Sequence, residues 1–236
     1  MRPGFQWDAA DAYLFDIDGT LLNSRDAVHY LAFQKAARAV LGIQVSIDGV
    51  PVHGNTDPGI LRAALQLSGL QNSKIDRHMG EIVDFMCADV ERNHEQLHPE
   101  LCPSIPELIA HLHGSGKLLG AASGNLEPIG WLKLQKAGLK PMFAFGAFSF
   151  PLEARADIFR HGIKLVRQRL GPEATVTVVG DTPADIEAAR ATGATVIALA
   201  TGIFCFADLI AHHPDACFAC GTDLMAQDRP GIDRLR

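Results

Sequence analysis

Four short hydrophobic runs rich in strand-forming residues stand out along the chain, each bounded by glycine, proline, aspartate or serine. They cover residues 12–15, 117–122, 175–179 and 195–199. Their hydrophobicity is continuous rather than alternating, which is typical of strands buried on both faces of a parallel sheet. Apolar residues recur at helical spacing in 106–113 and 158–170. This alternation predicts an α/β fold with right-handed crossovers.

The segment between the first two runs is far longer than the dozen or so residues that a crossover needs. It contains three amphipathic patterns with apolar residues at helical spacing. They cover residues 26–41, 58–69 and 74–94. We therefore expect a small helical domain at 22–97, inserted into a catalytic core made of 1–21 and 98–236.

Charge and composition restrict the partners of such a protein. The 236-residue chain has 21 basic and 27 acidic side chains and a formal net charge of −6, which argues against binding nucleic acid by neutralising its phosphates. No apolar run approaches the roughly 20 residues of a membrane span. Five cysteines without framework spacing are typical of a reducing compartment. We expect a cytoplasmic protein without a nucleic-acid or membrane partner, either monomeric or homodimeric.

Two aspartates, Asp16 and Asp18, follow the first hydrophobic run directly. The carboxyl edge of a parallel sheet is where such folds bind ligands. Alternation along an extended chain places both carboxylates on the same side, where they can share a metal ion or divide the roles of nucleophile and general acid/base. An isolated pair can also be a solvated strand end.

A second acidic site follows the run at 175–179. Asp181 stands at the end of that run and Asp185 one helical turn later. Asp181 can cap the helix that Pro183 opens, or it can hold a hard cation. Because both acidic sites fall on the same sheet edge, the sequence favours a magnesium-type site.

The run at 117–122 leads into Ser123, Gly124 and Asn125. A hydroxyl, a glycine and main-chain N–H groups before a helix can bind an anion, although Ser-Gly-Asn is also an ordinary turn. Three strand ends are thus predicted to bring an acid pair, an anion site and a metal-binding acid to one edge.

The order of these motifs, DIDGT, SGN, a basic residue and GDTPAD, resembles the haloacid dehalogenase-like hydrolase superfamily and, within it, the phosphoglycolate phosphatase-like branch. The resemblance covers nearly the whole chain. It implies a Rossmann-like core of three α/β/α layers with a helical cap after the first strand. It also implies that Asp16 is a nucleophile forming an aspartyl-phosphate, that Asp18 is the general acid/base and that Thr20 orients Asp18. Superfamily members that cleave carbon–halogen bonds lack the second aspartate, so Asp18 favours phosphoryl chemistry.

A carboxylate can attack an anionic phosphoryl group only if their repulsion is cancelled. The resemblance implies that Mg²⁺ does this. The ion would be held by the Asp16 carboxylate, the Asp18 main-chain carbonyl and Asp181, with Asp185 in the outer shell.

The same resemblance implies a lysine or arginine between the second and last motifs, and Arg155 is the best match. Arg160 and Lys164 are the alternatives, and Arg155 can instead form a surface ion pair. The phosphoryl oxygens would be held by Ser123 and the Gly124 amide.

A loop in the insert, His-Gly-Asn-Thr-Asp, aligns with a substrate-specificity loop that reads Gly-(Arg or Lys)-Thr-Asp in relatives. Here Asn55 replaces the cation and Thr56 follows it. If the loop closes over the site, this loss of charge suggests a less anionic leaving group or a substrate held from elsewhere in the cap. The loop can equally serve to cap the helix that begins at Pro58.

Cys217 and Cys220 have the spacing of half a zinc site, but no second pair follows and the stretch is better interpreted as a last short strand. The leading hypothesis is a magnesium-dependent phosphatase acting on a small phosphorylated metabolite through an aspartyl-phosphate on Asp16. The alternatives are a phosphomutase of the β-phosphoglucomutase type and a non-catalytic phosphometabolite-binding protein.

Overall fold

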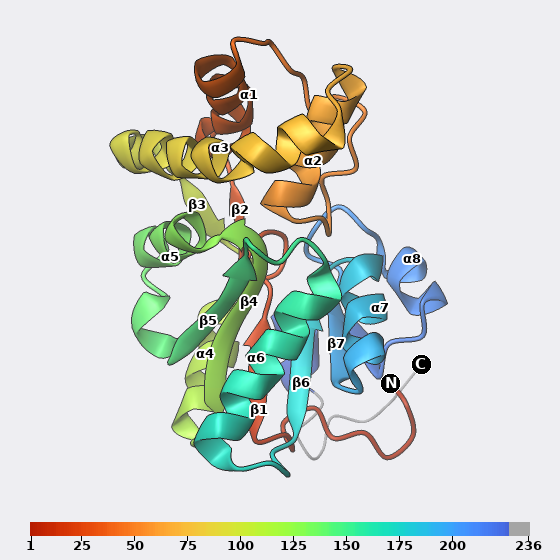
Figure 1. The fold of residues 1–236 in the computed structure, drawn as a ribbon. Coiled ribbons are helices and arrows are strands. Elements are labelled where there is room, and N and C mark those ends of the chain that lie inside the picture. The colour runs from red at the N-terminus through yellow and green to blue at the C-terminus, as the bar shows by residue number, and fades with distance from the viewer. Residues whose placement is uncertain (227–236) are drawn as a thin grey trace.

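The computed structural model describes residues 1–226 and contains a six-stranded sheet in which every pair of neighbours is parallel (Figure 1). The strand order is β5-β4-β1-β6-β7-β8. The strands are β1 (Ala12–Phe15), β4 (Leu118–Leu126), β5 (Phe145–Ser149), β6 (Val176–Gly180), β7 (Thr195–Leu199) and β8 (Ala216–Phe218). The predicted α/β fold is confirmed.

Helices cover both faces of this sheet, and β1 shows how. Tyr13 and Phe15 belong to one hydrophobic cluster, with α4, α5 and α9, whereas Ala12 and Leu14 belong to another, with α6, α7 and α8. Alternate residues of a strand point to opposite faces, so a strand buried on both faces must be hydrophobic at every position. The helices are α4 (Ile105–Gly114), α5 (Glu127–Lys136), α6 (Arg155–Leu170), α7 (Pro183–Thr192), α8 (Phe206–Ala211) and α9 (Gly221–Met225).

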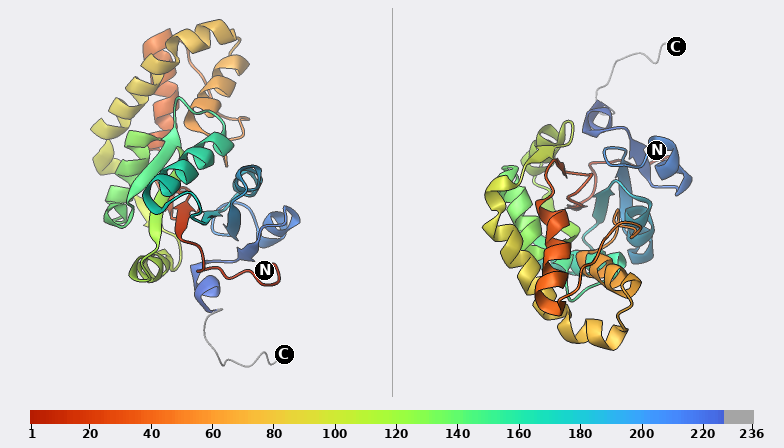
Figure 2. Two further views of the ribbon diagram at one scale, coloured as in Figure 1. Left: turned by 60° about the horizontal axis from the view of Figure 1, so that its bottom comes forward. Right: turned by 90° about the horizontal axis from the view of Figure 1, so that it is seen from above.

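The inserted segment forms a separate group of helices beyond the carboxyl edge of the sheet (Figures 1 and 2). These are α1 (Val28–Leu41), α2 (Asp57–Leu67) and α3 (Asn72–Arg92), with a 3₁₀ turn at His94–Gln96. Their apolar faces form a hydrophobic cluster of their own, to which Leu126 and Ile129 of the core also contribute. We call this segment the cap, and its boundaries at 22 and 97 remain a prediction.

The chain enters and leaves the cap through two adjacent strands. β2 (Leu22–Ser24) and β3 (Pro99–Leu101) pair antiparallel in a small sheet of their own. The two segments that join the cap to the core are therefore held side by side at the point of attachment.

Two features of the sheet differ from the prediction. β4 continues past 122 to Leu126, with a register shift after Ser123, and β5 was not predicted. A 3₁₀ turn at Lys140–Met142 precedes β5. None of the helices within residues 1–226 combines the length and apolar character needed to cross a bilayer.

Candidate active site

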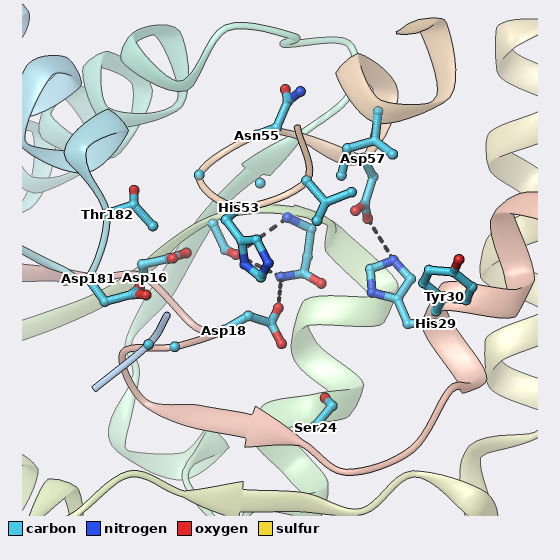
Figure 3. A pocket seen from close by; sticks show the side chains of 18 of the residues that line it. Asp16, Asp18, Ser24, His29, Tyr30, His53, Asn55, Asp57, Asp181 and Thr182 are labelled. Carbon is cyan, nitrogen blue, oxygen red and sulfur yellow. Dashed lines mark hydrogen bonds and ion pairs between the residues drawn. The ribbon is translucent and has the colours of Figure 1, made fainter. Parts of the chain in front are cut away.

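The strand ends bring the motifs together beneath the cap (Figure 3). The main-chain N–H of Asp16 still donates to the Val179 carbonyl at 2.9 Å, so sheet pairing holds Asp16 next to the end of β6. Asp181 follows β6 directly, and Ser123 lies in the irregular end of β4. Together with cap residues they line a cavity of about 300 Å³.

Three carboxylates lie together at the bottom of the site, and we call Asp16, Asp181 and Asp185 the acid cluster. They are buried and offer oxygens within 4.8 Å of one another. Burial, together with the neighbouring carboxylates, raises the pKa of Asp16 and of Asp181 above the ordinary carboxyl range. Full ionisation of the cluster is therefore unfavourable unless a further cation is bound.

Asp185 has a structural role within this cluster. Its Oδ2 accepts hydrogen bonds from the Thr182 hydroxyl (2.7 Å) and from the main-chain N–H groups of Thr182 (3.0 Å) and Asp181 (3.2 Å). Together with Thr182 it forms a capping box at the start of α7. Asp185 thus fixes the turn that carries Asp181.

Arg155, the first residue of α6, is the one cation of the acid cluster among the described residues. Its Nε donates to Asp185 Oδ1 at 2.6 Å, and its Nη2 lies 2.7 Å from Asp16 Oδ2. Nη2 is close enough for ion pairs, yet it is buried without a well-directed hydrogen bond to any described residue. Of the alternatives, Arg160 pairs with Asp157 at the surface, and Lys164 is exposed and does not line the cavity.

Asp18 belongs to a second group, which sequence reasoning missed. The buried Lys133 ammonium contacts both carboxylate oxygens of Asp18 (2.8 and 2.7 Å), Asn125 Oδ1 (2.9 Å) and His29 Nδ1 (3.1 Å). We call these four residues the Asp18 cluster. Burial acts to raise the pKa of Asp18, but Lys133, Asn125 and His29 outweigh it and hold that pKa below its ordinary value.

A sequence signal for Lys133 existed. In α5 it shares the buried face with Ile129, Gly130 and Leu134, and a lysine in an otherwise apolar stripe is rarely buried without an anionic partner.

Asn125 has a different role from the one expected. Its amide nitrogen donates to Asp18 Oδ2 (2.7 Å) and to Ser123 Oγ (2.8 Å), while its oxygen accepts from Lys133. The side chain is therefore fully engaged in positioning Asp18 and Ser123, which leaves it no free group for a ligand.

The expected role of Thr20 in orienting Asp18 is wrong. The Thr20 hydroxyl donates to Asp181 Oδ1 at 2.9 Å. The reason is the left-handed conformation of Gly19 (φ 87°), which turns the chain toward the end of β6, and a Cβ at Gly19 would overlap the Asp181 carboxylate. Lys133 and Asn125 orient Asp18 instead.

The cap loop reaches the site mainly through its main chain. Asn55 is hydrogen-bonded within the loop, to the Pro51 carbonyl (3.0 Å) and from the Thr56 N–H (2.8 Å). The Thr56 hydroxyl accepts from Gly59 N–H as the N-cap of α2 and donates to the Glu153 carbonyl of the core (2.8 Å). These side chains therefore hold the loop rather than present free groups, and the helix-capping interpretation is confirmed for Thr56.

The loop lies against the expected phosphate site. A Cβ at Gly124 would overlap the main-chain carbonyl oxygen of Asn55, so this close approach requires glycine. His53, from the same loop, projects its ring into the cavity (Figure 3).

Comparison with known proteins agrees with this geometry. Residues 10–193 match the model of the haloacid dehalogenase-like hydrolase family. The chain belongs to this family. It is 28% identical over 218 residues to a phosphoglycolate phosphatase from Synechococcus elongatus, covering 91% of this chain and 95% of that protein. Together these matches identify the haloacid dehalogenase-like chain as an enzyme, a hydrolase of the phosphatase type, and confirm the family resemblance.

Solved structures of this family share the fold. A predicted phosphatase from Clostridium acetobutylicum superposes with a TM-score of 0.69 at 15% identity, covering 92% of this chain and 97% of that one. A predicted phosphoglycolate phosphatase from Haemophilus somnus gives 0.66 at 20%, covering 93% and 98%. The β-phosphoglucomutase from Clostridium difficile gives 0.65 at 16%, covering 91% and 93%. At these identities the likeness concerns the fold alone.

Proposed function

We propose that this protein is a Mg²⁺-dependent phosphatase that hydrolyses a small phosphorylated metabolite through an aspartyl-phosphate on Asp16. One observation carries the proposal. Asp16 lies beside a buried arginine whose Nη2 lacks a well-directed acceptor among the described residues, at the bottom of a cavity that also holds Asp18. A phosphoryl oxygen would supply that acceptor.

The acid cluster fits a magnesium ion. Its donors are hard carboxylate oxygens. Burial and neighbouring carboxylates raise the pKa values of Asp16 and Asp181, and a bound cation would favour their ionised forms. Asp16 and Asp181 would hold the ion together with the Asp18 main-chain carbonyl, while Asp185, occupied by protein donors, would support them. When bound, Mg²⁺ would neutralise charge that otherwise repels a phosphate dianion.

Ser123 and Arg155 are assigned to binding the phosphoryl group. Because Ser123 Oγ already accepts a hydrogen bond from Asn125, its own hydrogen is directed away from that side chain and can be donated to a phosphoryl oxygen. Arg155 Nη2 would donate to another. Gly124, which lacks a side chain, leaves its N–H accessible at the same strand end.

In the first step an Asp16 oxygen forms a bond to phosphorus, the ester P–O bond breaks, and the leaving oxygen takes a proton from Asp18. In the second step Asp18 takes a proton from the water that attacks phosphorus, and the Asp16 carboxylate and phosphate are released. Lys133 favours the ionised form of Asp18, which the second step needs. A bound phosphate dianion opposes this effect of Lys133, because its negative charge raises the pKa of Asp18. The protonated form of Asp18 is then available for the first step.

Phosphate release from a panel of phosphomonoesters, with and without Mg²⁺, tests this proposal. We expect Mg²⁺-dependent turnover that falls about 10³-fold or more in an Asp16→Asn variant. Undiminished release by that variant would contradict the nucleophile assignment. Bisphosphate-dependent isomerisation of a sugar phosphate would indicate a mutase, and ligand binding without turnover a binding protein.

A further inference from the structure

We infer that the leaving group of the substrate carries no charge, so that the enzyme acts on the phosphate monoester of a neutral alcohol. This inference rests on the proposed function and specifies its substrate class. It is drawn from the side of the cavity that faces away from the acid cluster, where the group attached to phosphate would lie.

Four apolar side chains form part of the cap wall of the cavity. Phe33 of α1, Ile47 and Val52 of the following segment, and Ile60 of α2 line it. Phe33, Ile47 and Ile60 are buried. An anionic group placed against these side chains would lose its hydration without gaining a partner, which is costly.

Both cations of the cavity are already engaged near the reacting carboxylates. Arg155 lies between Asp16 and Asp185. The three N–H groups of Lys133 are shared among Asp18, Asn125 and His29. Arg155 has one poorly satisfied nitrogen, and the phosphoryl group would take it. Neither cation is free to pair with a second anion.

The cap carboxylates that line the cavity, Asp26 and Asp57, have the wrong sign to bind a second anion. Asp57, at the start of α2, is buried in the wall, with its Oδ2 3.1 Å from His29 Nε2 and 2.8 Å from the Leu126 nitrogen, which donates to it. None of the lysine and arginine side chains between residues 22 and 97, a stretch that the structure describes throughout, lines the cavity. Two of these cations pair with acids that do not line the cavity, Arg62 with Glu153 of the core and Lys35 with Asp89 of the cap.

The polar groups that remain suit an uncharged alcohol. The His53 ring projects into the cavity (Figure 3). Ser24 also lines the cavity, and its buried hydroxyl has no hydrogen-bond partner in the described chain. Asn55 turns its amide into its own loop. Hydroxyl and imidazole groups next to apolar side chains, with no lysine or arginine from the cap, favour a hydroxylated or weakly polar leaving group over a carboxylate or a second phosphate.

Two esters of the same size test this inference. Phosphoglycolate carries a carboxylate where 2-hydroxyethyl phosphate carries a neutral CH₂OH group. With the full chain and Mg²⁺ at pH 8, we expect kcat/KM to be at least about tenfold higher for 2-hydroxyethyl phosphate. Equal values, or a preference for phosphoglycolate, would overturn the inference.

A binding measurement separates failure of this inference from failure of the phosphatase proposal. Calorimetric titration of the Asp16→Asn variant with each ester and Mg²⁺ should show tighter binding of the neutral ester. If the wild type hydrolyses neither ester while the variant keeps this preference, the phosphatase proposal fails, but the selectivity of the cavity for an uncharged group attached to phosphate is retained. Binding of neither ester would overturn the inference.

A charge added to the wall provides the complementary test. His53→Lys places a cation in the cavity at an exposed loop position and should reduce the preference for the neutral ester about tenfold. Leu67→Lys adds the same charge at a cap position that is 70% exposed and outside the cavity, and it should leave the preference unchanged. No change in the His53 variant would show that the leaving group does not contact this wall.

Discussion

The acid cluster and the Asp18 cluster lie next to each other and are built from the same components, carboxylates and one buried cation. They differ in the number of carboxylates for each cation. Three carboxylates lie around Arg155 in the acid cluster, whereas Asp18 is the one carboxylate that Lys133 contacts among the described residues. The shifts in pKa are correspondingly opposite, upward for Asp16 and Asp181 and downward for Asp18. Asp18 is also the more exposed carboxylate, with 41% of its side chain accessible, whereas Asp16 and Asp181 are buried. The comparison shows that burial and the number of nearby cations together set the direction in which a carboxyl pKa shifts.

This difference also divides the two clusters by function. The acid cluster has a charge deficit that an added cation relieves, which suits a metal site. The Asp18 cluster is electrostatically complete, and it includes a cap residue, His29, so its full set of contacts exists only when the cap lies against the core. We therefore expect metal to control the first cluster and cap position to control the second.

Removing the cation of the acid cluster should have the largest effect. Arg155→Met leaves three buried carboxylates together, and we expect the free energy of unfolding to fall by about 3–5 kcal/mol at pH 8, with loss of turnover. The loss should be smaller near pH 5, where the carboxyl groups can be protonated. Urea unfolding at both pH values measures this loss in the free energy of unfolding.

Arg155→Lys is the matched control for this variant. Lysine keeps the positive charge but cannot donate from two nitrogens as the guanidinium group does. The Arg155→Lys variant should therefore have most of the wild-type stability and little of its activity. Equal stability of the Arg155→Met variant and the wild type at pH 8 would show that the cluster is not charge-limited.

Added Mg²⁺ should stabilise the protein in a pH-dependent way. The pKa values of Asp16 and Asp181 are raised in the folded state above the ordinary carboxyl value of 3.8. As the pH rises above 3.8, the unfolded chain releases these protons while the folded, metal-free protein still holds them, so the folded state loses stability. Protons and Mg²⁺ compete for the same oxygens, so the rise in Tm on adding Mg²⁺ should be larger at pH 8.5 than at pH 5.5. At 100 times its Kd, the ion would contribute about 2.7 kcal/mol.

An Asp181→Asn variant is the control for the magnesium effect. It should be more stable than the wild type in the absence of metal at pH 8.5, because one repelling charge is gone, and it should lose most of the response to Mg²⁺. A response to Mg²⁺ that is equal at the two pH values would contradict the assignment of these carboxylates as ligands.

Removing the cation of the Asp18 cluster should have a smaller and more specific effect. In Lys133→Met, burial is no longer opposed by the ammonium, so the pKa of Asp18 rises and the ascending limb of the kcat–pH profile moves to higher pH. Turnover should therefore fall more at pH 6 than at pH 8. Lys136→Met, an exposed position on the same helix, should leave the profile in place, and a uniform loss at every pH would indicate a merely structural role for Lys133.

The parts of the fold that could be predicted are those encoded locally. β1 and β6 are buried on both faces and therefore read as continuous hydrophobic runs, and Asp16 and Asp181 follow them directly. The cap helices could be predicted for a similar reason, because their apolar residues recur at helical spacing within one stretch of sequence. Positions at strand ends then follow from the geometry of parallel sheets.

The missed features depend on contacts between distant segments. Thr20 bonds to Asp181 because β1 and β6 are neighbours in the sheet, and no local pattern fixes that order. Strand β5 is defined by its pairing with β4, and the apolar stretch at 141–152 does not itself distinguish a strand from other buried structure. Lys133 becomes a functional candidate only when its helix is placed against Asp18.

The close approach of Gly124 to the Asn55 carbonyl has a consequence for how the cap moves. The contact joins main chain to main chain, so neither side can yield by changing a rotamer. The backbone at position 124 therefore limits how closely the cap loop can approach the end of β4. A single methyl group there would push the Asn55 carbonyl, and with it this loop, away from the cavity that both segments line.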